Sequence, residues 1–120
     1  MEQINDNAAG SAFPGPTHRI TVAPGPSLTL VVLEGPIDQD AAAELRLEAQ
    51  RLLSGDAAVQ IDWHAATYAS AGAIQVLLAL ESALKARGRN LRVLRDNVEI
   101  RCFLELAGLS GHFSVMEQPG

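Results

Sequence analysis

Residues 59–88, VQIDWHAATYASAGAIQVLLALESALKARG, predict a strand, a tight turn and a long apolar helix. The turn is Ser70-Ala71-Gly72, and Gly88 ends the helix. A helix start of this kind presents free backbone N–H groups and the positive end of the helix dipole. The turn is therefore a suitable position for binding an anion or for a hydroxyl that can be modified.

Strand and helix patterns alternate on both sides of this unit. The predicted elements, in order, are strands 19–22 and 28–33, a helix ending at 53, strand 58–62, helix 71–87, strand 91–94, a helix from 97 to 108 and a short strand 112–115. A hairpin followed by alternating strands and helices predicts an α/β fold with one mixed sheet. We expect four to five strands, with three to four helices mainly on one side.

The connection between the second strand and the first helix carries two predictions. Glu34-Gly35-Pro36 contains a glycine and a proline, so it is expected to end the strand. Asp38 or Asp40 is then expected to cap the helix, because a carboxylate can accept hydrogen bonds from the free N–H groups of the first turn.

Length and composition predict a single domain. The chain has 120 residues, of which 48% are hydrophobic, which is enough for one core. Residues 1–17 contain polar residues, glycine and proline and show no periodic pattern of hydrophobic residues. They are expected to form a flexible arm. The domain itself is expected to span residues 18–116, followed by a short tail, 117–120.

The net charge and the apolar runs limit the classes of partner that we expect. A net charge of −5 with no basic stripe disfavours nucleic acid and anionic membranes as partners. The longest apolar run, 71–80, is far shorter than the roughly 20 residues that a membrane-spanning helix needs. One cysteine and the lack of a signal-peptide layout at the first residues favour a reducing cytoplasm. We expect a cytoplasmic protein that does not insert into membranes.

An enzymatic function is not expected. His18, His64 and His112 lack the spacing of metal ligands. A hydrolase nucleophile turn around Ser70 would need glycine where Tyr68 stands. We therefore predict no catalytic residue, no metal and no cofactor.

An ordered series of short motifs closely resembles a STAS domain, the fold of bacterial anti-sigma-factor antagonists. The motifs are LEGPID (33–38), VQID (59–62), TY (67–68), SAG (70–72), IQVLL (74–78), ARGRNL (86–91) and LAGL (106–109). The resemblance covers about residues 18–115 and lies in the whole series, because no single motif is diagnostic.

The resemblance implies a small module that docks a partner, often an anti-sigma-factor kinase, and is released when a serine or threonine at the helix start is phosphorylated. The usual signature is Asp-Ser-Ser-Gly, with the second residue as acceptor. Matching Ser-Ala-Gly by eye makes Ser70 the acceptor. Counting without gaps from Asp62 and from Gly88 places Ala71 there instead, and this register is preferred because both flanks agree. The usual phospho-switch is then absent, and Ser70 is more simply a helix N-cap.

The expected partner-binding residues surround this turn. Ile74 and Leu78 are expected to form an apolar patch on the helix, with packing against the helix that ends at residue 53 as the alternative. Trp63 either packs under its loop or serves as an aromatic anchor. The full set is Asp38, Trp63, His64, Ser70, Ala71, Gly72, Ile74, Gln75 and Leu78.

Three roles follow from the resemblance. The first is a signalling module that docks a kinase, an anti-sigma factor or a chemosensory protein, because the alanine-rich turn before IQVLL looks like STAS domains of chemotaxis clusters. The second is a phosphorylation-switched anti-anti-sigma factor, acting in transcription regulation, that uses Ser70. The third is a structural subunit similar to the STAS component of lipid-transport ATPase complexes.

Overall fold

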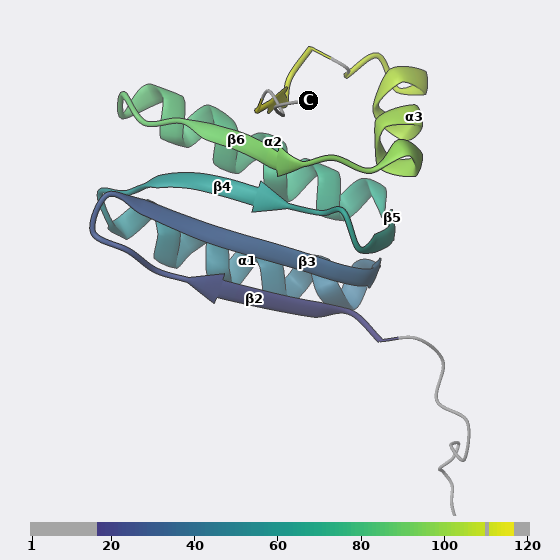
Figure 1. Cartoon of the computed structure of the whole chain (residues 1–120), viewed down its shortest axis with the longest axis horizontal. Helices are drawn as coiled ribbons and strands as arrows, with labels where there is room; N and C mark the ends of the chain where they lie inside the picture. Colours follow the sequence, from purple (N-terminus) through teal and green to yellow (C-terminus); the bar gives the residue numbers. More distant parts are fainter. Residues whose placement is uncertain (1–16, 110, 117–120) are drawn as a thin grey trace, which may run out of the picture.

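The computed structural model describes residues 17–109 and 111–116. The expected arm, apart from Thr17, and the expected tail lie outside these residues. The elements are β2 Arg19–Ala23, β3 Leu28–Ile37, α1 Gln39–Ser54, β4 Ala58–Asp62, β5 Ala66–Ala69, α2 Ala71–Ala86, β6 Leu91–Arg95, α3 Val98–Leu106 and β7 Ser114–Val115. Helices α1 and α2 lie side by side behind one face of the sheet, and α3 lies at one end of it (Figure 1).

The sheet is mixed, as predicted. Its strands follow the order β2-β3-β4-β6-β7, and β5 pairs with β3 outside this path. The β2–β3 pair is antiparallel and the other pairs are parallel. The described residues thus form six strands and three helices, one strand more than expected, because residues 66–69 form the short strand β5.

The prediction that Glu34-Gly35-Pro36 ends the second strand was wrong. Strand β3 continues to Ile37, with its register shifting between Gly35 and Pro36. Gly35 has a φ of +74°, which glycine adopts without a steric penalty. This bend lets β3 pair with β4 over residues 28–32 and then with β5 over residues 35–37.

Each helix begins at a side-chain cap that the sequence contains. Asp38, and not Asp40, caps α1, because its Oδ1 accepts a hydrogen bond of 2.9 Å from the N–H of Ala41. Asn97 caps α3 through the N–H groups of Glu99 and Ile100. These caps fix where the chain leaves the sheet and enters each helix.

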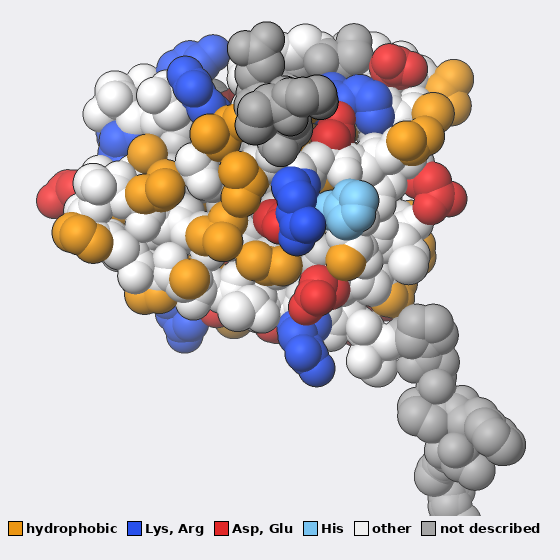
Figure 2. Space-filling model, viewed as in Figure 1, with side chains coloured by type: hydrophobic (Ala, Val, Ile, Leu, Met, Phe, Trp, Pro, Cys, Tyr) orange, Lys and Arg blue, Asp and Glu red, His pale blue; other side chains and the backbone are white. Residues whose placement is uncertain are grey.

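The core lies between the sheet and the two long helices. Alternate residues of the central strands, among them Val31, Leu33 and Ile61, are buried in one cluster with residues of both helices, such as Leu45 of α1 and Leu77 of α2. Each large aliphatic side chain buried in this way contributes roughly 1.5–3 kcal/mol. No helix of the described residues covers the opposite face of the sheet, and hydrophobic side chains gather on it among charged ones (Figure 2).

Candidate functional site

The starts of α1 and α2 meet at one end of the sheet. The N–H of Ser70 donates a hydrogen bond of 2.8 Å to the carbonyl oxygen of Ile37, which joins the two strand-to-helix connections. A Cβ placed on Gly72 would lie 3.9 Å from the Cβ of Ala42, so the first turns of the two helices are in close contact. Asp38 and Ser70 therefore cap neighbouring helix ends.

Ser70 is the N-cap of α2, as predicted. Its backbone is extended, and its Oγ accepts a hydrogen bond of 3.1 Å from the N–H of Ala73. The side chain thereby satisfies one of the free donors of the first turn. Ser70 is half-buried, whereas Ala71, the first residue of the helix, is exposed.

The exposed surface around this turn is built mainly from small or uncharged side chains. Gln75 lies one turn beyond Ala71 and is exposed, and Leu78, half-buried, follows it. Tyr68 of β5 is 47% exposed and was not among the expected binding residues, although it stands in the TY motif. We call this the docking surface: Asp38, Tyr68, Ser70, Ala71, Gly72, Gln75 and Leu78.

Two expected binding residues lie in the core instead. Ile74 is only 2% exposed, and Trp63 is fully buried. Ile74 is covered because α1 runs beside α2 and widens the buried face of α2, which is the alternative that the helical period left open. Both residues support the docking surface from below and are not part of it.

Trp63 has a defined place beneath the connection that follows β4. Its ring packs edge-on against Phe113, with centroids 5.5 Å apart. Its Nε1 donates a hydrogen bond of 2.8 Å to Oδ1 of Asp96, and Nε of Arg101 donates one of 2.9 Å to Oδ2 of the same carboxylate. Of the expected interpretations of Trp63, packing under its loop is the correct one.

The ionised form of Asp96 is favoured by these partners. Burial on its own would raise the pKa of Asp96, but the hydrogen bonds from the indole of Trp63, the N–H of Asn97 and the guanidinium of Arg101 outweigh it. The pKa of Asp96 therefore lies below its ordinary value. Sequence reasoning missed Asp96, which stands in the segment between a strand and a capped helix.

The segment that carries His64 is held by a second set of contacts. Oδ1 of Asp62 accepts a hydrogen bond of 3.1 Å from the N–H of His64, and Oδ2 accepts one of 2.8 Å from Arg95. Asn97 donates its side-chain amide to the carbonyl oxygens of His64 and Ala66. His64 itself is exposed, as predicted for a loop residue. These contacts fix the path into β5 and so the position of Tyr68 and Ser70.

The arrangement suits contact with a protein surface. Within residues 17–109 and 111–116, no three histidine, cysteine or acidic side chains are grouped to hold a metal ion. None of the helices described is long and apolar enough to cross a membrane. A helix start with small, uncharged side chains at its centre and Asp38 at its edge presents donors and an apolar area to a partner.

Comparison with known proteins gives one family match. The family model described as "Mlab, STAS domain" matches residues 20–117. No curated protein matches the chain.

Three of the solved structures that match do so over most of their length. An anti-sigma factor antagonist from Mycobacterium paratuberculosis has a TM-score of 0.73 at 19% identity, covering 85% of this chain and 87% of that one. The unphosphorylated anti-sigma factor antagonist SpoIIAA has a TM-score of 0.69 at 12% identity, covering 85% and 90%. RsbS of Moorella thermoacetica has a TM-score of 0.66 at 17% identity, covering 84% and 88%. At these identities the matches show a shared fold.

Proposed function

This chain belongs to the STAS domain family, and from that premise we propose that it is a protein-interaction module of bacterial signalling that acts like an anti-sigma factor antagonist. Residues 18–116 are the functional unit, which acts in the cytoplasm without a catalytic residue. The observation that carries the proposal is the docking surface, where an exposed helix start is bordered by small side chains. Two of the similar structures are anti-sigma factor antagonists, which supports the same role.

The proposed partner is an anti-sigma-factor kinase or a chemosensory kinase or receiver. Ala71 and Gly72 leave room for a partner side chain to approach the free N–H groups of α2, and Gln75 and Tyr68 offer polar contacts at the rim. Asp38, with 41% of its side chain exposed, favours a basic residue on the partner at this edge.

The proposed module lacks the usual phospho-switch. Phosphorylation needs a hydroxyl, and Ala71 at the preferred acceptor position has none. The oxygen of Ser70, one residue earlier, is occupied as the cap of α2. A shift of one residue relative to the catalytic groups of a kinase places the hydroxyl out of line for transfer.

Intact-mass measurement tests the switch. The chain is incubated with ATP and a purified anti-sigma-factor kinase from the same organism, and Ser70→Ala and Ala71→Ser are treated in the same way. We expect no added phosphate in the wild type and one added phosphate in Ala71→Ser, because that substitution restores a hydroxyl at the acceptor position. One phosphate on the wild type that disappears in Ser70→Ala would instead support the phosphorylation-switched factor that uses Ser70.

Binding measurements test the surface. Titration calorimetry with the same kinase compares the wild type with Ala71→Glu and with Ala23→Glu, an equal substitution at an exposed position of β2 far from the docking surface. We expect Ala71→Glu to weaken binding by about tenfold or more, and Ala23→Glu to leave it unchanged. Equal affinities for all three proteins would contradict the docking surface. Binding to a neighbouring transporter ATPase, and not to a kinase, would favour the lipid-transport role.

A further inference from the structure

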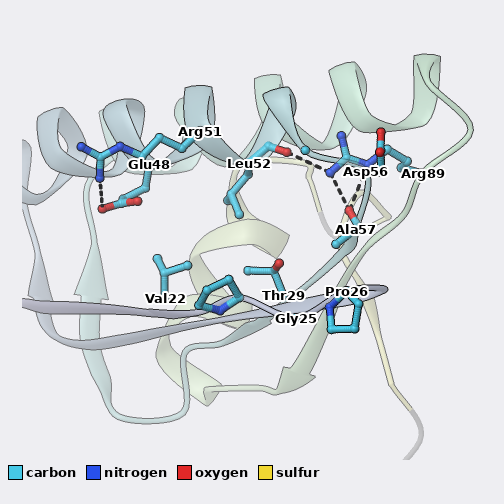
Figure 3. A pocket seen from close by; sticks show the side chains of 12 residues that line it. Val22, Gly25, Pro26, Thr29, Glu48, Arg51, Leu52, Asp56, Ala57 and Arg89 are labelled. Carbon is cyan, nitrogen blue, oxygen red and sulfur yellow. Dashed lines mark hydrogen bonds and ion pairs between the residues drawn. The ribbon is translucent and has the colours of Figure 1, made fainter.

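A cavity of about 420 Å³ lies at the end of the molecule opposite the docking surface. The β2–β3 hairpin forms its floor, the last turns of α1 form its roof, and Ala57 and Arg89 close one end (Figure 3). Volumes of about 300–1,000 Å³ are typical of sites for small organic molecules. The thirteen residues of α1 from 40 to 52 rise by roughly 18 Å and separate the cavity from the docking surface.

The hydroxyl of Thr29 opens onto the floor of this cavity. Thr29 is only 6% exposed, and its hydroxyl forms no hydrogen bond with another of the described residues. Its side chain rises from the strand toward the roof in Figure 3. A hydroxyl that opens only onto the cavity forms its hydrogen bonds with whatever fills the cavity, either water or a bound molecule. Thr29 is therefore a polar anchor for an occupant.

The two arginines of the cavity are already engaged. Arg51 donates a hydrogen bond of 3.1 Å to Oε2 of Glu48, and its side chain is 75% exposed. Arg89 donates to the carbonyl oxygens of Leu52 at 2.8 Å and of Ala57 at 2.9 Å, at the negative end of the α1 dipole. Neither guanidinium is directed at the centre of the cavity to receive an anion.

The groups that remain open are acceptors. Oε1 of Glu48 forms no hydrogen bond with the described residues. Because only 22% of the Glu48 side chain is exposed, solvent screens its charge weakly. The exposed carboxylate of Asp56 forms no hydrogen bond with the described residues and adds a second negative charge at the rim. Such a set of groups prefers a hydrogen-bond donor that carries a positive charge.

The space between these groups is apolar. Val22 on the floor faces Leu52 on the roof, and Pro26 closes the side near Thr29 (Figure 3). Pro24 also lines the cavity. We propose that this cavity binds a small organic cation, a primary amine with an apolar body. The apolar body of the amine lies between Val22 and Leu52, and its ammonium group donates a hydrogen bond to Glu48. The hydroxyl of Thr29 forms a further hydrogen bond with the bound amine.

The test is an NMR titration of the full-length chain with three probes of equal size: 2-phenylethylamine, 2-phenylethanol and phenylacetate. We expect the amine to shift the amide signals of Thr29, Leu52 and Ala57 saturably and to bind about tenfold more tightly than the alcohol. Phenylacetate is expected to bind more weakly than both. Equal or tighter binding of phenylacetate, saturable shifts at other residues, or no saturable shift at millimolar amine would each overturn the proposal.

Matched variants separate the charge from the shape of the cavity. Glu48→Gln is expected to lower the affinity for the amine at least about fivefold and to leave the affinity for the alcohol unchanged. Glu44→Gln, four residues earlier on the same helix and outside the cavity, is expected to change neither. Thr29→Val, which retains the shape of the side chain, is expected to weaken both ligands. An amine affinity that does not change in Glu48→Gln would show that the carboxylate is not the recognition group.

Discussion

The indole Nε1 of Trp63 lies 2.8 Å from Oδ1 of Asp96 and donates a hydrogen bond to it, across 33 residues of sequence. Arg101 binds the second oxygen of the same carboxylate. One aspartate therefore joins the end of β4 to α3 beneath the connection that leads to β5. The position of the docking surface depends on this carboxylate, because the same connection carries the chain toward Tyr68 and Ser70.

The first prediction concerns Asp96→Asn. Replacing the carboxylate by an amide removes the charged partner of Arg101, and we expect the free energy of unfolding at neutral pH to fall by about 1–3 kcal/mol. Because the pKa of Asp96 is lower in the folded protein than the ordinary 3.8, its contribution is fully present above pH 3.8 and is lost as the pH falls through the folded value. The difference between wild type and variant should therefore shrink in acid.

Denaturant titrations at several pH values measure this effect. Trp63 is the single tryptophan of the chain, so its fluorescence reports on the interaction directly. Asp56→Asn, at an exposed position with no side-chain hydrogen bond to the described residues, is the control and should unfold like the wild type. A constant difference between Asp96→Asn and wild type from neutral pH down to strongly acidic solution would contradict the linkage.

The second prediction concerns the cap of α2. Ser70→Ala removes the acceptor for the N–H of Ala73, and we expect a loss of about 1 kcal/mol in the free energy of unfolding. Ser82→Ala makes the same change at an exposed position inside the same helix, where alanine has the higher helix propensity, and should be neutral or slightly stabilising. Thermal unfolding followed by circular dichroism compares the two. Equal melting temperatures would show that the cap does not contribute.

Local signals predicted most of the fold. The boundaries of α1 and α2 follow from Asp38 and Ser70 at their starts and from Gly88 after the second helix, because caps depend on nearby backbone groups alone. Strand β5 was missed because four residues after a loop carry too little pattern. Its pairing is set by the bend at Gly35, a contact between distant parts of the chain.

The site was predicted less completely, for a related reason. Helical period places Ile74 beside the buried face of α2 but does not say how far α1 extends over it. Trp63 is a large aromatic residue after a strand, and only the distant Asp96 and Phe113 make that position part of the core. Ala71 and Gln75 at the helix start are exposed, and their role in binding a partner stays a prediction.

The third prediction compares two glycines with left-handed backbones. Gly35 and Gly88 have φ values of +74° and +71°. A Cβ on Gly35 would lie 2.5 Å from the carbonyl oxygen of Thr17, whereas a Cβ on Gly88 would have no atom of the described residues within 4 Å. We expect Gly88→Ala to cost about 1–2 kcal/mol from the backbone alone and Gly35→Ala to cost more. Urea unfolding of both variants checks this order, and an equal cost would contradict the close approach at Gly35.

The last prediction concerns the stability of the protein without a ligand. Thr29→Val exchanges the hydroxyl on the cavity floor, which forms no hydrogen bond with the described residues, for a methyl group of similar size. Because Thr29 as a whole is only 6% exposed, the change replaces a partly desolvated polar group by an apolar one. We expect the free energy of unfolding to rise by about 1 kcal/mol, measured by urea titration. Thr21→Val, at an exposed position of β2, is the control and should change stability by less than about 0.5 kcal/mol. A loss of stability in Thr29→Val would contradict this prediction. It would show that water in the cavity stabilises the folded protein through a hydrogen bond to the hydroxyl of Thr29.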